Sequence, residues 1–350
     1  MEGDEPYGGR WNFDSENRHA FNQDAITLIP KPLLFQNDVR AINERLEHHN
    51  VPRFGKQKDI SIWPTNRAQS LSLLKSFCTQ CLPLFGTYQD AMTDKSPNAW
   101  SLYHSRLSFC LNTKMLSPMQ VIDAALNTYH KSDGSIALAQ VEGFIRQILG
   151  WREYVRGIYW INQPNYSKKN TLKARRKLPD WFWNGETNMN CQKQAIQQSL
   201  DYSYAHHIQR LMITGNFSLL TGLDPDQVEA WYLGIYIDAI EWVEQPNTRS
   251  MALFADNGWI ATKPYAASGN YVKKMSDYCV DCKYSVSKKT GDGACPLNSF
   301  YWHFLERNKG SLEKNPRLAF PYKTWQKMKP EAKHEILEQA ESYLNQLESL

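Results

Sequence analysis

Three cysteines share one short loop in the last quarter of the chain. Cys279 and Cys282 form a C-x-x-C pair, and after twelve intervening residues Cys295 precedes a proline in "YCVDCKYSVSKKTGDGACPLN". Two thiols with this spacing can bind one metal centre, and Gly291 and Gly293 would let the loop turn back before Cys295. Zinc and a 4Fe–4S cluster each take four ligands. The sequence therefore predicts a metal site whose fourth ligand comes from outside this loop.

Four other cysteines are candidates for the fourth ligand. Cys78, Cys81 and Cys110 lie in apolar helical patterns, where cysteine is commonly a small core residue. Cys191 follows a loop instead, at the expected start of a helix in "ETNMNCQKQ". The residues alone therefore favour Cys191 without excluding the others, and the spacing does not separate zinc from an iron–sulfur cluster.

A second candidate site is the basic, aromatic stretch "SKKNTLKARRKLPDWFW". It places six basic residues beside two tryptophans, which is typical of a nucleic-acid surface but also of a solvated loop: Lys168, Lys169, Lys173, Arg175, Arg176 and Lys177. The net charge of +4 only mildly favours binding to a polyanion. The 12 Trp and 18 Tyr suit planar ligands, stacked bases or redox chemistry, and equally a large helical core.

The elements that must position these residues are predicted to be helices, so the fold class is all-α. Hydrophobic residues in "QVEGFIRQILGWREYVRGIYW" keep helical spacing on one face: Val141, Phe144, Ile145, Ile148, Leu149, Val155, Ile158 and Tyr159. Similar patterns cover 68–85, 119–130, 194–220, 225–244 and 330–347, and Ser117-Pro118 and Pro296 mark helix starts. We expect residues 1–55 to wrap over a helical domain formed by 56–350.

The chain has no apolar run of the roughly 20 residues that a membrane span needs, and its N-terminus is polar and acidic, unlike a signal peptide. Seven cysteines, an odd number, indicate a reducing compartment. We therefore expect a cytoplasmic protein without a membrane partner.

Several longer motifs resemble the iron–sulfur bacterial cryptochrome and photolyase family. They are "GGRWNFDSENR", "VEGFIRQILGWREYVRGIYW", "YAHHIQRLMITGNF" and "KPYAASGNYVKKMSDYC", and the resemblance covers nearly the whole chain. It implies the helical FAD-binding domain of that fold and a 4Fe–4S cluster on Cys191, Cys279, Cys282 and Cys295. It also implies a DNA lyase that repairs (6-4) pyrimidine photoproducts with blue light and reduced flavin.

The resemblance implies FAD contacts along the chain. "HSRLS" looks like the family's phosphate-binding stretch, and "GWREY" resembles the run that lines its flavin cavity. The implied cofactor-binding residues are Arg18, His104, Ser105, Leu107, Ser108, Trp151, Arg152, His207, Arg210, Asp238 and Glu244. Arg210 and Asp238 would form an ion pair beside the flavin ring, and Glu244 would hold or donate a proton near it.

The same resemblance assigns catalytic and electron-transfer residues. His207 is the expected proton-transfer residue at the lesion, and the other implied lesion contacts are His206, Met251, Tyr265 and Trp151. Trp183, Trp231 and Tyr232 would pass electrons toward the flavin, with Trp183 nearer the surface. The resemblance also implies a magnesium ion near Asp14, and damaged DNA as the partner.

Members of this family begin with a Rossmann-like antenna domain, and this chain starts at the segment that follows it. We therefore expect no antenna chromophore here, and a separate antenna domain or subunit as a further partner. Two other functions are compatible with the residues: a cryptochrome-type light receptor without repair activity, and a metal-stabilised nucleic-acid-binding module without flavin.

Overall fold

The computed structural model describes residues 3–55 and 58–350, and the chain divides into two compact units. The first unit extends to Tyr154 and the second spans Val155–Leu350. The helices confirm the predicted all-α class, and the only strands among the described residues are a pair of two residues each. None of the described helices combines the length and the apolar character that crossing a bilayer requires.

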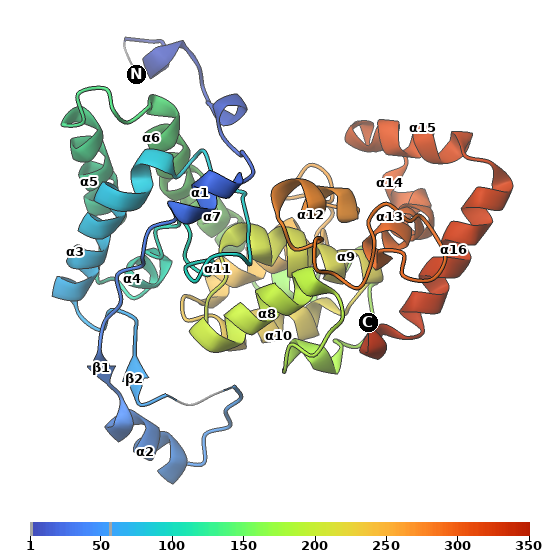
Figure 1. Ribbon diagram of the computed structural model, residues 1–350, viewed down its shortest axis with the longest axis horizontal. Helices are drawn as coiled ribbons and strands as arrows, with labels where there is room; N and C mark the ends of the chain where they lie inside the picture. Colours follow the sequence, from blue (N-terminus) through green and yellow to red (C-terminus); the bar gives the residue numbers. More distant parts are fainter. Residues whose placement is uncertain (1–2, 56–57) are drawn as a thin grey trace. The chain divides into compact units, whose positions relative to one another are not determined.

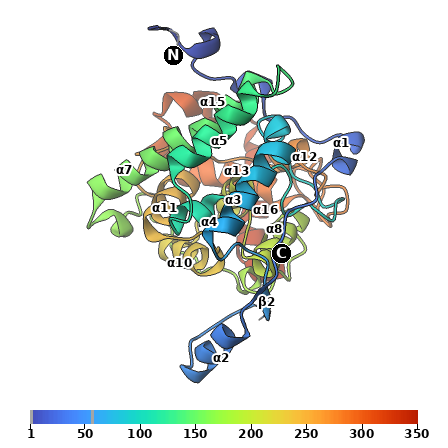
Figure 2. The ribbon, with the colours of Figure 1, turned by 90° about the vertical axis from the view of Figure 1, so that its left-hand side faces the viewer.

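The first unit contains a two-stranded hairpin and short helices (Figure 1). Its elements in chain order are α1 Gln23–Thr27, β1 Asn37–Asp38, α2 Arg40–His48, β2 Ile60–Ser61, α3 Arg67–Ser76, α4 Ser108–Asn112, α5 Pro118–His130 and α6 Leu138–Ile145. The antiparallel register pairs Asn37 with Ser61. Helices α3 and α5 lie side by side over one apolar core, with α6 against α5 (Figure 2).

The segment that was expected to wrap, residues 1–55, is tied to the first unit by polar contacts. The Asn17 side chain donates to the carbonyl of Ala139 at 3.1 Å, and the Tyr103 hydroxyl donates to Leu28 at 3.2 Å. Asn17 leaves no room for a side chain at Gly86. An ideal Cβ on Gly86 would lie 2.5 Å from the side-chain oxygen of Asn17. These contacts hold the N-terminal segment against α6 and the turn before Asp90.

The second unit is built from longer helices around an aromatic core. Its helices are α7 Glu153–Asn162, α8 Asn190–Tyr202, α9 Asn216–Thr221, α10 Pro225–Ile235, α11 Glu241–Gln245, α12 Gly269–Met275, α13 Pro296–Arg307, α14 Lys309–Leu312, α15 Ala319–Lys327 and α16 Pro330–Leu344. Helix α13 packs on α9 and α16, as Figure 1 shows for α16. Trp231, Phe217, Phe300 and Phe304 are almost fully buried among them.

Four stretches of the described residues wind as π-helix: Phe77–Cys81, Arg146–Arg152, Gln209–Gly215 and Pro246–Ala252. The second and third coincide with motifs that the resemblance marked, and the fourth contains Met251, an implied lesion contact. Such wider turns are rare and are frequent at functional sites. They also shift the helical register, which explains why Leu149, predicted on the buried face, is 62% exposed.

The pattern predicted over residues 194–220 is interrupted in the structure. Ser203 adopts a left-handed conformation with φ 51° and ends α8, and the next helical turn begins at His207. A second interruption separates α10 from α11 at Tyr236–Ile240. The first break contains His206, an implied lesion contact, and ends at His207, and the second contains Asp238, an implied flavin contact.

Candidate functional site

The second unit gathers four cysteines on one pocket. Cys191 comes from the first turn of α8, Cys279 and Cys282 from the loop before α13, and Cys295 from the residue that precedes α13. Apolar and aromatic side chains complete the lining, among them Met189, Val272, Tyr278 and Tyr284. The structure therefore brings Cys191 to the loop cysteines, whereas Cys78, Cys81 and Cys110 lie in the first unit, two of them buried in its core.

Local backbone geometry shapes this loop. Gly291 and Gly293 have φ of +85° and +69°, the left-handed conformation that glycine adopts without strain. The turn brings Ser285 close to Gly293 and Cys295, so that its N–H donates to the Gly293 carbonyl and its own carbonyl accepts from the Cys295 N–H. Gly269, at the start of α12, approaches so closely that an ideal Cβ would lie 2.8 Å from the Cys295 sulfur.

Burial favours the protonated form of three of these thiols. Burial raises the pKa of Cys279 to about 11 and that of Cys295 to about 12, and it raises that of Cys191 well above its usual value. The backbone N–H groups of Leu297 and Asn298 lower the pKa of Cys295 against this effect. A bound cation would have to displace these protons, because thiolate is the ligand form of cysteine.

Arg210 is the centre of a buried ionic cluster in the same unit. Its guanidinium donates to both carboxylate oxygens of Asp238, at 2.9 and 3.1 Å, and to Glu244 at 3.1 Å. It also donates to the carbonyl of Ala205 at 2.7 Å and lies 3.8 Å from the centroid of the Tyr236 ring. Each of the three guanidinium nitrogens therefore has its own partner, which fixes the plane of the group.

The cluster contains more carboxylate charge than Arg210 neutralises. Burial raises the pKa of Glu244 to about 7, although Arg210 opposes the shift, so this carboxyl exchanges a proton near neutral pH. Burial alone would lower the pKa of Arg210, but Asp238 and Glu244 raise it above its usual value. Arg210 thus stays charged while Glu244 can store a proton.

The two neighbouring histidines have different environments. His206 is buried, with 1% exposure, whereas the side chain of His207 is open to solvent. Protein atoms packed around the imidazole of His207 lower its pKa to about 4, and the charge of Arg210 acts in the same direction. His207 is therefore the accessible member of the pair, and it is neutral at pH 7.

The aromatic residues implied in electron transfer form a contact series in the second unit. Trp231 is fully buried, donates its ring N–H to the Phe182 carbonyl at 2.9 Å, and contacts Tyr232 and Tyr236 edge-on at centroid distances of 5.5 and 5.8 Å. Tyr236 stacks on Arg210. Trp183 is 44% exposed and follows Phe182, whose ring contacts Trp231 edge-on at a centroid distance of 5.3 Å.

The basic stretch is anchored to the second unit at several points. Arg249, which is 3% exposed and paired with Glu229, donates to the Lys169 carbonyl at 3.0 Å. The Thr171 N–H and hydroxyl both donate to Ala255, at 2.8 and 2.9 Å. Arg176 differs from the other five predicted contacts, because its guanidinium donates inward to the Thr221 carbonyl. Lys177 pairs with Asp180 at 2.9 Å, so Lys168, Lys169, Lys173 and Arg175 are the basic side chains left for an external anion.

The structure adds a residue that the sequence did not single out. Trp259 is 45% exposed on a turn, with the Lys169 ammonium 5.9 Å from its ring centroid. Asp256 holds this turn by accepting from the N–H groups of Gly258 and Trp259 and from the Tyr166 hydroxyl. The sequence signal was "FADNGW", an Asp-Asn-Gly turn directly before a tryptophan. Of the other implied lesion contacts, Met251 is buried and Tyr265 is partly exposed.

In the first unit, the predicted phosphate-binding stretch borders a pocket. His104, Ser105 and Arg106 line it together with Ser76 and Ser101. The Ser105 hydroxyl accepts from the Leu107 N–H at 3.4 Å, and Ser108 begins α4. The pocket therefore offers hydroxyl, imidazole and backbone groups, the kinds of donor that a pyrophosphate requires.

The π-helical stretch Arg146–Arg152 holds the next predicted residues of the first unit. Arg152 donates to the Asn112 side chain at 3.3 Å, and Trp151 contacts the Tyr154 ring edge-on at 6.3 Å. Both side chains are partly exposed. A further predicted residue, Arg18, is exposed and has a left-handed backbone with φ 67°.

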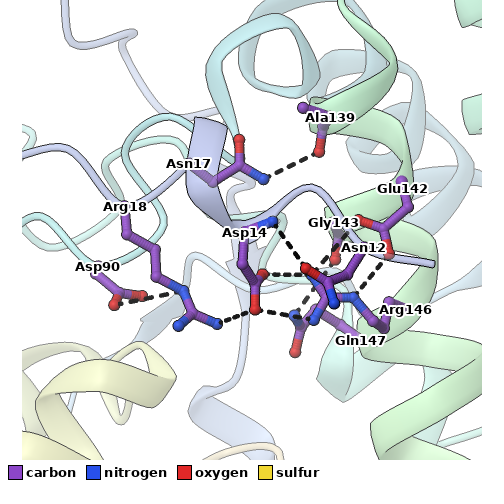
Figure 3. Close-up of polar contacts among 10 residues, drawn as sticks. All are labelled: Asn12, Asp14, Asn17, Arg18, Asp90, Ala139, Glu142, Gly143, Arg146 and Gln147. Atoms are coloured by element: carbon purple, nitrogen blue, oxygen red, sulfur yellow. Dashed lines mark hydrogen bonds and ion pairs between the residues drawn. The ribbon is translucent and has the colours of Figure 1, made fainter. Parts of the chain in front are cut away.

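Asp14 lies between two arginines, as Figure 3 shows. Its carboxylate accepts from Arg146 at 2.5 Å through one oxygen and from Arg18 at 3.0 Å through the other. Arg146 also pairs with Glu142 at 2.8 Å, and Arg18 approaches Asp90 at 3.9 Å. Both Asp14 oxygens are thus already bonded to guanidinium groups, which does not suit the predicted magnesium ligand.

The flavin residues that were predicted from the sequence fall in both units, and each set is defined by contacts within its own unit. Comparison with known proteins identifies the family. The family model described as deoxyribodipyrimidine photo-lyase-related protein matches residues 1–61. An uncharacterized protein of Acanthamoeba polyphaga mimivirus is 32% identical over 136 residues, which are 39% of this chain and all of that protein.

Two solved structures are more distant in sequence. A bacterial class III photolyase from Agrobacterium tumefaciens is 20% identical with a TM-score of 0.48, over 61% of this chain and 45% of that one. A cryptochrome from Synechocystis is 14% identical with the same TM-score, over 83% and 58% of the two chains.

The relative that decides the family is a protein of Agrobacterium fabrum named (6-4) photolyase. It is 46% identical over 350 aligned residues, which cover 99% of this chain and 68% of the relative. Identity at this level over nearly the whole chain confirms the resemblance that the motifs indicated, and it shows that this protein belongs to the (6-4) photolyase family.

Proposed function

We propose that this protein is a light-driven, FAD-dependent DNA photolyase that repairs (6-4) pyrimidine photoproducts. The observation that carries the proposal is the 46% identity, over 99% of the chain, to the Agrobacterium fabrum protein named (6-4) photolyase. The ionic cluster around Arg210 and the accessible His207 beside it support the same function, because they supply fixed charge and a proton carrier.

The residues present fit FAD in chemical type. Reduced FAD, when bound, supplies the light-driven electron that breaks the lesion apart. His104, Ser105, Leu107 and Ser108 offer donors for the phosphates, and Arg18, Trp151 and Arg152 are the further predicted contacts of the first unit. In the second unit Arg210 and Asp238 offer a fixed ion pair to the flavin ring, and Glu244 holds a proton near neutral pH.

His207 is the residue that we assign to proton movement at the lesion. Its pKa of about 4 makes it neutral at pH 7, so it first accepts a proton or donates its ring N–H as a hydrogen bond. Binding of DNA phosphates nearby would raise this pKa, because negative charge favours the imidazolium ion. We assign His206, Met251, Tyr265 and Trp151 to the lesion pocket as supporting residues.

We assign Trp231, Tyr232 and Trp183 to delivery of electrons toward the flavin. The edge-on ring contacts and the burial of Trp231 support this route, since closely packed rings shorten each transfer step. The Tyr232 hydroxyl is held by Thr214 and by the Arg210 carbonyl, both at 2.7 Å. That hydroxyl thus links the aromatic series to the ionic cluster.

We propose that the four cysteines hold a 4Fe–4S cluster. Among the residues that the structure describes, no three His, Cys, Asp or Glu side chains are close enough together to share a single metal ion. Tetrahedral zinc would need cysteine sulfurs about 3.8 Å apart, from Zn–S bonds of about 2.3 Å. A 4Fe–4S cluster bonds each cysteine to a different iron, so the four sulfurs need not meet at one ion. The four cysteines line one pocket together with apolar side chains, which is compatible with such a cluster.

Magnesium is not part of the proposal. Both oxygens of Asp14 are bonded to Arg18 and Arg146, and a cation would have to replace a guanidinium group there. We derive no step of the reaction from it.

Damaged DNA is the proposed partner, and the second unit supplies a surface of suitable chemistry. Lys168, Lys173 and Arg175 are exposed on the anchored basic stretch, and Lys169 lies beside Trp259. Basic side chains bind phosphates, and an exposed indole can stack on a base. The enzyme must reach a nucleotide flipped out of the duplex, and a rigid rim of this kind supports the flip.

The test is repair of a duplex that carries one (6-4) photoproduct by the reduced protein under blue light. The wild type should repair it, and His207→Ala should keep the flavin spectrum while repair falls about 10²–10⁴-fold. A wild type that binds FAD but does not repair would favour the light-receptor function. A protein that binds DNA without flavin bands would leave only the nucleic-acid-binding module.

A further inference from the structure

The cysteine pocket is connected to the histidine pair by a short chain of buried side chains. Tyr278 precedes Cys279, is 2% exposed, and accepts a hydrogen bond from the Gln209 side-chain N–H at 3.2 Å. Its carbonyl accepts from the Asn190 side chain at 2.9 Å, and Asn190 precedes Cys191. Tyr278 thus touches the flanks of two of the four cysteines.

Gln209 is fully buried and uses both ends of its amide. Its oxygen accepts from the His206 backbone N–H at 3.2 Å and from Gln198 at 2.9 Å, while its N–H group donates back to Gln198 at 2.9 Å. Gln198 donates further to the Tyr204 carbonyl at 3.2 Å. The paired amides therefore hold the break after α8 from inside.

This break, which we call the histidine turn, is residues 203–207. Ser203 starts it in a left-handed conformation, the Ala205 carbonyl accepts from the Arg210 side chain at 2.7 Å, and His207 ends it. A turn of this kind has few backbone hydrogen bonds of its own, so its geometry depends on the side chains that contact it. The contacts with Gln209 and Gln198 are the buried ones.

We propose that Tyr278 and Gln209 are positioning residues that make the geometry of the histidine turn depend on the four-cysteine pocket. A filled pocket fixes the loop that carries Tyr278, Tyr278 fixes Gln209, and Gln209 fixes the His206 backbone and with it His207. The four-cysteine site then serves repair by holding the proton carrier in place. This inference rests on the proposed function for the role of His207, but its structural part can be tested separately.

The experiment compares hydrogen exchange of the histidine turn in the cofactor-loaded protein and four variants. Tyr278→Phe removes one buried hydroxyl, and Tyr322→Phe is the matched control, because its hydroxyl is equally buried and donates to Leu305 at 2.9 Å. Gln209→Met keeps the side-chain length without the amide. Peptides that cover residues 203–210 are followed by mass spectrometry, together with iron and FAD content.

Tyr278→Phe and Gln209→Met should speed exchange of the His206 amide about five- to tenfold, the effect of one lost buried hydrogen bond, with iron and FAD retained. Tyr322→Phe should leave this exchange unchanged. Cys282→Ser, which lacks a ligand, should loosen the same peptide. Photorepair by Tyr278→Phe should fall in parallel.

Three results would overturn the inference. One is unchanged exchange of the turn in both Tyr278→Phe and Gln209→Met. Another is an equal increase in Tyr322→Phe, which would show general destabilisation. The third is loss of iron from both Tyr278→Phe and Gln209→Met, which would show that these two side chains support the cysteine pocket instead of the histidine turn. Absence of repair in the wild type would reject the proposed function, while the exchange results would still stand.

Discussion

Replacing Gly269 by alanine tests how tightly the protein is built around the cysteine pocket. Gly269 is the first residue of α12, and its N–H donates to the Asn298 side chain at 3.2 Å. An ideal Cβ would lie 2.8 Å from the Cys295 sulfur, 3.1 Å from Val286 and 3.3 Å from Asn298. Three neighbours would thus have to move for one added methyl group.

Two opposing effects determine the size of the change. Alanine is favoured over glycine in a helix by about 1 kcal/mol, and the backbone here does not require a positive φ. Overpacking of a close site costs about 1–3 kcal/mol. The carbon–sulfur contact needs roughly 3.6 Å or more, so the sulfur or the helix must shift by nearly 1 Å, which a cluster ligand does not tolerate.

The expected result is a folded protein that binds iron poorly. Gly157→Ala is the matched control, since Gly157 lies inside α7 and its ideal Cβ has no neighbour within 4 Å. That control should raise stability by about 0.5–1 kcal/mol and keep iron. Iron and sulfide content, visible absorption and the rate of cluster loss to a chelator measure the difference. A Gly269→Ala protein with full, chelator-resistant iron would refute the packing argument.

Three further predictions concern the ligands, the proton store and the electron route. Cys191→Ser should lose iron and melt at a lower temperature, whereas Cys81→Ser should retain iron; iron analysis that finds the reverse would reject the ligand set. Glu244 has a pKa raised from 4.5 to about 7, so its protonated form stabilises the protein below about pH 4.5 and this contribution is lost as the pH rises through 7. Relative to Glu244→Gln, the wild type should therefore lose stability between pH 5 and 8, by on the order of 1–3 kcal/mol in denaturant titrations, and parallel curves would contradict this. Trp231→Phe should slow flavin photoreduction at least tenfold, measured by absorption during blue-light illumination. Trp160→Phe, a change at a 63% exposed indole, should leave the rate unchanged. Equal rates in the wild type and both variants would place the electron route elsewhere.

Local sequence signals predicted much of the fold. Ser117 caps α5 as expected, accepting from the Gln120 N–H at 3.2 Å, and Pro296 opens α13. Capping residues and prolines act over one helical turn, so they can be recognised without knowing the partners. The exposed face at Leu149 could not be recognised, because the π-helical turn that displaces it is stabilised by its neighbours in the fold.

The sequence by itself determined the chemistry that is available. Spacing alone indicates that Cys279, Cys282 and Cys295 share one loop. The two residues between Cys279 and Cys282 limit how far these two thiols can separate. The residue pattern favoured Cys191 as the fourth ligand without excluding the other cysteines, and the resemblance to a known family named it; Arg210 came from the resemblance alone.

Only the tertiary structure decided which of these residues meet and in what state. In the folded chain, Cys191 lies in the same pocket as the three loop cysteines, and His206 is buried while His207 is exposed. Both carboxylate oxygens of Asp14 are paired with arginines. It also set the pKa of Glu244 near 7, because burial depends on residues that are distant in the chain. Contacts, burial and protonation are properties of the packed chain, and a pattern along the sequence carries little information about them.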